Sequence, residues 1–79
     1  MPKRSRQVLK REMAQAHYSV DRALIRIQSL HEKFSEHHEQ HTEYLELITA
    51  VLLQSQEMML DFWRLSWGKL PDNLDTYRK

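Results

Sequence analysis

The stretch TEYLELITAVLLQSQEMMLDFWRLSW, residues 42–67, decides the fold. It holds no proline or glycine, and its apolar residues recur at helical spacing, which predicts one long helix. The a and d positions of a heptad repeat form one apolar seam: Ile48, Val51, Met58, Phe62 and Leu65. Other apolar residues spread around most of the remaining circumference: Leu45, Leu47, Leu52, Leu53, Met59, Leu60 and Trp63. A helix that is apolar nearly all round is normally covered on more than one side.

The end of this helix is marked by Gly68 and Pro71. Glycine readily adopts the left-handed conformation that closes many helices, and proline cannot continue one. We therefore expect the helix to end at Trp67 and residues 68–79 to form a short C-terminal extension.

Residues 6–36 carry a narrower apolar stripe. Two sets of residues each repeat every seven positions: Met13, Val20, Ile27 and Phe34, and Leu9, Ala16, Ala23 and Leu30. This pattern predicts an amphipathic helix that packs through one face. Residues 1–7, which overlap its start, read as a basic tail.

Between the two apolar segments lies SEHHEQHTE, residues 35–43, which is entirely polar. We interpret it as the turn of an all-α, two-helix antiparallel hairpin, with helices over 6–36 and 42–67 in a single domain. The alternative is one long coiled-coil helix, because an acidic stripe that includes Glu32, Glu39 and Glu46 continues in register through the gap. No glycine or clear cap decides between the two.

The length and composition of the chain limit the kinds of function that we expect. A chain of 79 residues without cysteine cannot use disulfides or thiolate zinc sites to reinforce a small core. We therefore expect self-association into a helical bundle, such as a four-helix bundle, or association with a larger protein. Neither a secretory leader nor a membrane-spanning segment is recognisable, so we expect a cytoplasmic protein. No phosphate loop or nucleophile motif is present, so we expect no enzyme activity, cofactor or small-molecule substrate.

The second helix supplies the candidate protein interface. Aromatic and large aliphatic residues are the usual anchors of protein interfaces. The candidates are Leu45, Ile48, Leu52, Met59, Phe62, Trp63 and Trp67. In this interpretation the chain is an assembly or adaptor protein.

The charge distribution suggests an alternative function. Residues 1–30 carry seven Lys and Arg against two acids, whereas residues 31–60 carry one Lys against six Glu. The candidate nucleic-acid contacts are Lys3, Arg4, Arg6, Lys10 and Arg11. Such a cluster can neutralise several phosphates without reading a base sequence. The alternative is therefore an accessory protein that binds RNA or DNA through a basic N-terminal arm.

His37 and His41 lie four residues apart and would share one helical face. That spacing can hold Zn²⁺ or Ni²⁺, but two ligands make only half of a site. We therefore assign no metal to this chain from the sequence.

Overall fold

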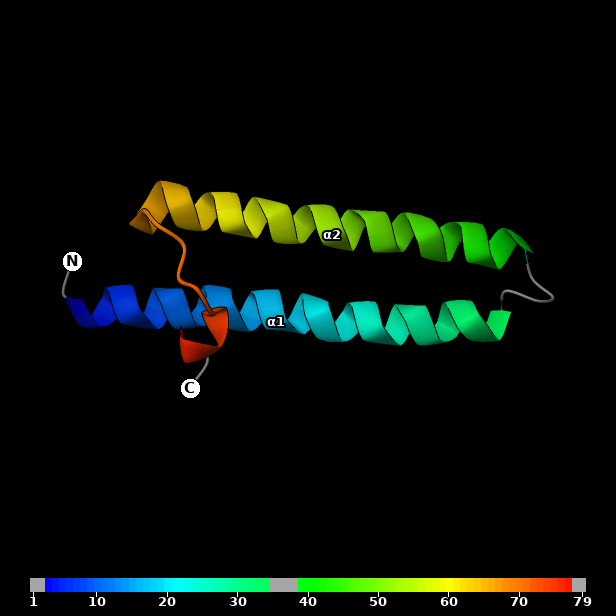
Figure 1. The fold of residues 1–79 in the computed structure, drawn as a ribbon, viewed down its shortest axis with the longest axis horizontal. Helices are drawn as coiled ribbons and strands as arrows, with labels where there is room; N and C mark the ends of the chain where they lie inside the picture. The colour runs from blue at the N-terminus through cyan, green and yellow to red at the C-terminus, as the bar shows by residue number, and fades with distance from the viewer. Residues whose placement is uncertain (1–2, 35–38, 78–79) are drawn as a thin grey trace.

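The chain folds as a helical hairpin in the computed structural model, which describes residues 3–34 and 39–77. Helix α1 (Lys3–Phe34) and helix α2 (Glu39–Trp67) run antiparallel along each other, and a short 3-10 helix η1 (Leu74–Tyr77) follows (Figure 1). The molecule is a rod with extents of 54 × 22 × 20 Å. No strand occurs in the described ranges. The predicted all-α hairpin is confirmed, and the alternative of one continuous helix is excluded.

The helices begin earlier than their apolar patterns. Helix α1 starts at Lys3, inside the segment interpreted as a tail, and α2 starts at Glu39 rather than at residue 42. Lys, Arg, Gln and Glu are good helix formers, so backbone hydrogen bonding extends beyond the residues that pack. The predicted end of the first helix at residue 36 lies outside the described residues, as does the connection over 35–38.

Helix α2 ends at Trp67, as the sequence predicts, because Gly68 reverses the backbone. Its φ is +88°, and its N–H donates to the Arg64 carbonyl oxygen at 3.0 Å. Asn73 then starts η1: its side-chain oxygen accepts from the Asp75 N–H at 2.9 Å, and its carbonyl accepts from the Thr76 hydroxyl at 2.7 Å. These bonds satisfy backbone groups that a short helix leaves open.

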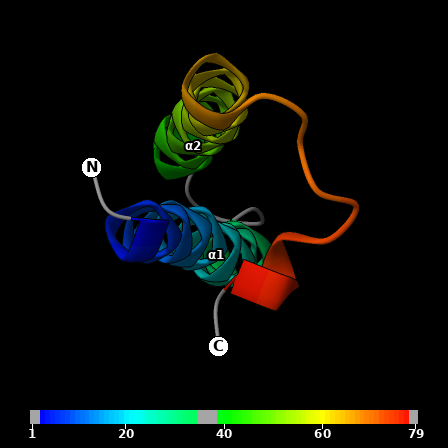
Figure 2. The same ribbon diagram turned by 90° about the vertical axis from the view of Figure 1, so that its left-hand side faces the viewer.

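The C-terminal extension folds back over one flank of the hairpin (Figure 2). The Tyr77 ring lies against the Trp63 ring, with centroids 5.1 Å apart, and the Lys10 ammonium is 5.6 Å from the Tyr77 centroid. Ala14, one turn further along the same flank of α1, is only 1% exposed. The small core of the molecule is therefore concentrated where α1, α2 and η1 meet.

Candidate protein interface

One seam of α2 packs against α1, and we call it the inner seam. Its residues alternate at intervals of four and three: Leu45, Thr49, Leu52, Gln56, Met59 and Trp63. Facing residues of α1, such as Val20, Leu24 and Ile27, are likewise partly buried. This alternation is the coiled-coil spacing that keeps side chains on one seam between two helices. The inner seam is therefore occupied within the single chain.

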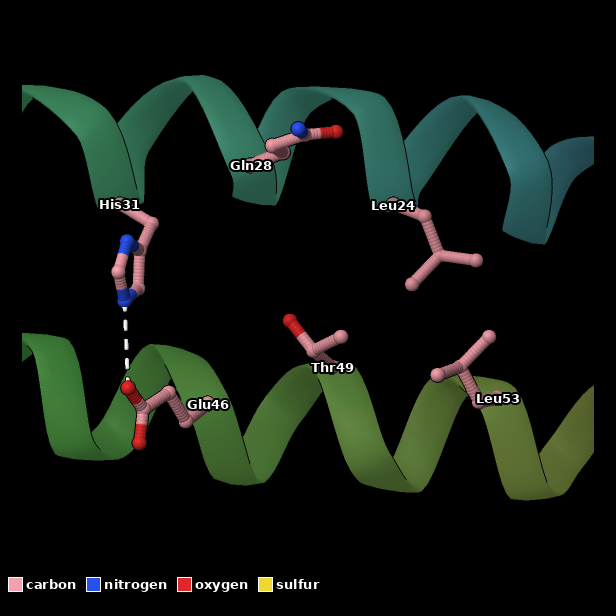
Figure 3. Close-up of a pocket in the computed structure, with 6 residues that line it drawn as sticks. All are labelled: Leu24, Gln28, His31, Glu46, Thr49 and Leu53. Atoms are coloured by element: carbon pink, nitrogen blue, oxygen red, sulfur yellow. Dashed lines mark hydrogen bonds and ion pairs between the residues drawn. The ribbon is translucent and has the colours of Figure 1, made fainter.

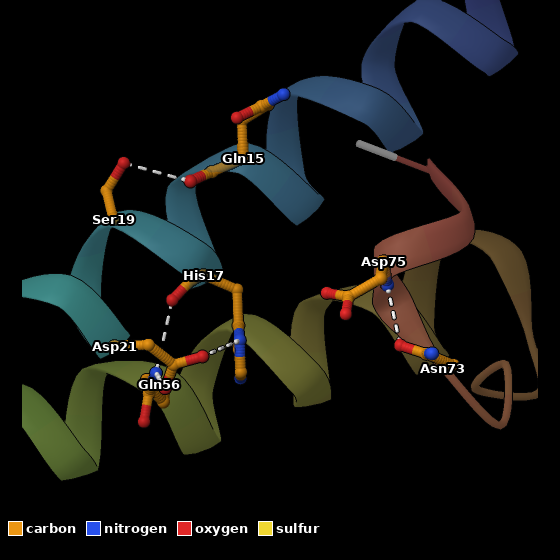
Figure 4. A network of polar contacts seen from close by, with 7 residues as sticks. All are labelled: Gln15, His17, Ser19, Asp21, Gln56, Asn73 and Asp75. Carbon is orange, nitrogen blue, oxygen red and sulfur yellow. Dashed lines mark hydrogen bonds and ion pairs between the residues drawn. The ribbon is translucent and has the colours of Figure 1, made fainter. Parts of the chain in front are cut away.

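Gln56 is the buried polar residue of this seam, and it is hydrogen-bonded to α1. Its side-chain N–H group donates to the His17 carbonyl oxygen at 3.1 Å and to Asp21 Oδ1 at 2.7 Å (Figure 4). The His17 Nδ1 atom lies 3.8 Å from Asp21 Oδ2. A single polar residue with partners on the facing helix favours one alignment of two helices over shifted ones. Gln56 thus fixes which residues of α1 and α2 lie level with each other.

A shallow cavity further along the hairpin is lined by both polar and apolar groups. It lies between Leu24 and His31 of α1 and Glu46 and Leu53 of α2 (Figure 3). The His31 Nε2 atom is 3.4 Å from Glu46 Oε1 across its edge, and the Glu46 side chain is largely exposed. An exposed pair of this kind adds little to stability. This flank is the one that η1 partly covers.

The aromatic residues at the end of α2 form a cluster of edge-to-face contacts. Ring centroids are 4.8 Å apart for Trp63 and Trp67, and 5.8 Å apart for Phe62 and Trp67. Trp63 lies at the centre, between Trp67 and Tyr77, and is 2% exposed. The ring that the sequence marks as an interface anchor is thus part of the intramolecular core.

A second seam of α2 lies about 100° around the helix from the inner seam, and we call it the outer seam. It also alternates at intervals of four and three: Tyr44, Ile48, Val51, Ser55, Met58, Phe62 and Leu65. Its apolar members are exposed, including Val51 at 63%, Met58 at 64% and Phe62 at 48%. The spacing matches that of the inner seam, yet no part of the described chain covers it. It has the form of a seam that packs against another helix.

Apolar residues of α1 lie beside the outer seam and enlarge this exposed surface. Leu9, Glu12 and Ala16 of α1 line a shallow, mostly apolar cavity together with Phe62 and Trp67 of α2. Ala23 and Leu30 repeat the same helical position at intervals of seven residues. We call the outer seam and these α1 residues, Leu9, Ala16, Ala23 and Leu30, the open face. It lies on the flank of α1 away from Lys10 and Ala14, and thus away from η1.

The predicted interface residues divide between the two seams. Leu45, Leu52, Met59 and Trp63 lie on the inner seam and face α1. Ile48 and Phe62 lie on the outer seam, and Trp67 is half-buried beside Trp63. The exposed apolar surface also includes residues outside the predicted set: Tyr44, Leu47, Val51, Met58 and Leu65. The heptad pattern contains most of these, but spacing alone does not show which seam faces inward.

The basic residues lie on a different edge of α1. Arg6 and Arg11 are exposed and Lys10 is half-buried beneath Tyr77, whereas the side chains of Lys3 and Arg4 lie outside the described part. Exposed cations recur along the outer edge of the helix, next to the open face: Arg11, Arg22, Arg26 and Lys33. We call this set the basic edge.

The histidines of the turn give no complete metal site among the described residues. No group of three or more His, Cys, Asp or Glu side chains lies close enough there to hold a metal ion. His41 stacks on Phe34, with centroids 5.4 Å apart, and its sequence partner His37 lies outside the described ranges. Within the same ranges no helix is long and apolar enough to cross a bilayer.

No protein-family model, curated protein or solved structure matches this chain. What the chain does must therefore be inferred from its own residues and their arrangement. The open face is an apolar surface that packing within the described residues leaves exposed.

Proposed function

We propose that this chain is a non-enzymatic assembly or adaptor protein that acts by binding protein through its open face. The single observation that carries the proposal is the outer seam. It keeps coiled-coil spacing from Tyr44 to Leu65, and its apolar residues are exposed. Isolated exposed apolar residues are ordinary on proteins, but a continuous apolar stripe marks an interaction surface.

The total surface of the chain supports this proposal. A compact monomer of the chain's 9.6 kDa exposes about 5,100 Å² by the usual scaling of surface with mass. The chain exposes 6514 Å². The excess is more than the roughly 800 Å² that each partner contributes to an ordinary protein interface. The hairpin therefore exposes enough surface to bury an ordinary protein interface on association.

The chemistry of the open face also suits a protein partner. Phe62, Met58 and Val51 are large and apolar, and methionine adapts its shape to a neighbouring surface. Aromatic and methionine side chains are enriched at the centres of protein interfaces. Exposed charges lie at the borders of the face, where Glu43 and Asp61 are found on α2, and at Glu12 within its α1 half. An apolar centre with a charged border is the usual anatomy of such a site.

The test is to place charges in the outer seam without disturbing the inner one. We expect the double variant Val51→Glu, Met58→Glu to keep its helical circular dichroism and to lose association in sedimentation velocity. Where the wild-type chain is monomeric, it should bind a hydrophobic dye that reports exposed apolar surface, and the double variant should not. Leu53→Glu is the matched control, because Leu53 is an exposed leucine on the opposite flank of α2. It should leave association unchanged.

The outcomes separate the proposal from its alternatives. A wild-type chain that sediments as a monomer and binds no dye would contradict the proposed function. A wild-type monomer that binds dye, with the signal lost only in the double variant, would leave the open face free for a different protein. Equal effects of the Leu53 control and the double variant would show that the open face has no special role.

A second candidate function, binding of RNA or DNA, is favoured by the basic edge. Arg11, Arg22, Arg26 and Lys33 are exposed on one side of α1, a stripe that can follow a phosphate backbone. An electrophoretic shift assay over a range of salt concentrations tests it. Binding that persists after Arg11, Arg22 and Arg26 are changed to Ala would exclude this edge as the contact.

A further inference from the structure

We propose that the open face is covered by a second copy of this chain, packed so that α1 of each copy lies across α2 of the other. The product is an antiparallel four-helix bundle with a two-fold axis along the helices. This inference rests on the proposed function and specifies its partner and its geometry. A face-to-face dimer of two hairpins has one other regular arrangement, in which α1 meets α1 and α2 meets α2.

Side-chain size favours the first arrangement. The α1 half of the open face is centred on the small residues Ala16 and Ala23, whereas the α2 half carries Val51, Met58 and Phe62. The hydrogen bond from Gln56 to His17 shows which residues of the two helices lie at the same position along the hairpin axis. Along this axis Ala16 is at the height of Met58, and Ala23 is near the height of Val51. A two-fold axis parallel to the helices does not shift residues along that direction, so the same residues lie opposite each other between the two copies. Small residues then meet large ones, which fills space, whereas α1 on α1 would set alanine against alanine.

Charge favours the same arrangement. The basic edge borders the open face on α1, which also carries Glu12, while Glu43 and Asp61 border it on α2. Asp61 is paired with Arg64 of its own helix at 3.0 Å, so among the described residues Glu43 is the unneutralised acid of this border. With α1 across α2, the edges of opposite charge come together, and Lys33 reaches the height of Glu43 of the partner subunit. The Phe34–His41 stack sets that level within one chain. With α1 across α1, the basic edge would meet its own copy, and like charges that face each other are unfavourable.

Available area favours a second copy as the occupant. The excess surface of the chain, about 1,400 Å² over a compact monomer of its mass, is of the size that one subunit of a stable dimer buries. The face includes both helices along most of the rod, so a partner of the same length covers it from end to end. A second hairpin supplies the same length and the complementary pattern of size and charge.

The chain has no cysteine, so single cysteines can report which helices meet. Ser55 lies in the middle of the α2 half of the open face, and Ser19 lies beside the α1 half at nearly the same height. The full chain is made as Ser19→Cys and as Ser55→Cys, and the two are mixed and mildly oxidised. Ser29→Cys is the matched control, because Ser29 is an exposed serine on the side of α1 opposite to Val20, which faces α2.

The mixture of Ser19→Cys and Ser55→Cys should give cross-linked pairs containing one chain of each kind. Since association holds the two thiols together, we expect at least about tenfold more of this product than from the Ser29→Cys and Ser55→Cys mixture. Ser55–Ser55 and Ser19–Ser19 cross-links in the separate samples would overturn the arrangement in favour of α1 on α1. Background cross-linking throughout, with a sedimenting monomer, would overturn the second copy as occupant. The proposed function would then still stand if the wild-type chain binds dye and the outer-seam double variant does not.

Discussion

The inner and outer seams of α2 belong to the same helix and share the same spacing, yet only the inner seam is covered by the chain. The inner seam contains the polar residues Thr49 and Gln56, whereas the outer seam has only Ser55 among large apolar residues. Apolar content therefore does not decide which seam faces inward. Gln56 donates hydrogen bonds to α1, and the Trp63 ring packs against Tyr77 of η1. These contacts favour the inner seam as the buried one, and the more apolar outer seam is left exposed.

The largest effect should come from comparing the neighbouring aromatic residues Trp63 and Phe62. We expect Trp63→Ala to lower the free energy of unfolding by about 3–5 kcal/mol, because it empties the centre of the core. Phe62→Ala should cost less than about 1 kcal/mol when measured at low concentration, since its ring is half exposed. Urea titration followed by circular dichroism measures both. Equal losses of free energy would mean that Trp63 of the inner seam is no more buried in the core than Phe62 of the outer seam.

The next largest difference in the free energy of unfolding should be between variants of Tyr77, which packs on the inner seam, and of Tyr44, which belongs to the outer seam. Tyr77→Ala should lower the free energy of unfolding by about 1–2 kcal/mol, because Tyr77 packs on Trp63 and Lys10. Tyr44→Ala is the counterpart on the outer seam and should leave it nearly unchanged in dilute solution. Tryptophan fluorescence during denaturation reports both, and the Tyr77 variant should show a red-shifted native spectrum. An unshifted spectrum would show that η1 does not shield Trp63.

The buried amide of the inner seam should contribute less. Gln56→Ala removes two hydrogen bonds to α1 and should lower the free energy of unfolding by about 1–2 kcal/mol. Gln54→Ala changes the same type of side chain at an exposed position and should change it by less than about 0.5 kcal/mol. Guanidinium titration of the pair measures the difference. Matching values would show that the Gln56 contacts to α1 do not stabilise the hairpin.

The smallest effect should be at Gly68, which ends α2 and lets η1 return to the inner seam. A Cβ at this position would meet no atom within 4 Å, so only the positive φ of 88° opposes a larger residue. Gly68→Ala should therefore lower the midpoint of thermal unfolding by an amount equivalent to about 1 kcal/mol. Ser66→Ala, an exposed helical position nearby, should leave the midpoint unchanged. A Gly68 variant as stable as the wild type would imply that the chain can leave α2 by another route.

The sequence predicted the two helices, the end of α2 at Trp67 and the presence of more apolar surface than one neighbour covers. It did not predict which residues are covered. The repeat of Met13, Val20, Ile27 and Phe34 does face α2, but the predicted seam of α2 lies outside and residues such as Leu45 and Trp63 lie inside. The choice depends on contacts distant in sequence, above all those of Gln56 with His17 and of Trp63 with Tyr77. The spacing of apolar residues in one helix does not predict such contacts with residues elsewhere in the chain.

Whether copies of the chain cover the outer seam is tested most directly by methionine oxidation of the unmodified chain at low and high protein concentration, resolved by mass spectrometry. Met58 lies on the outer seam and its neighbour Met59 on the inner seam, so each reports one surface. If copies of the chain cover the outer seam, Met58 is oxidised rapidly in dilute solution and becomes protected as concentration rises, while the oxidation rate of Met59 stays constant. A Met58 rate that remains fast at every concentration would contradict the claim that copies of the chain cover the outer seam.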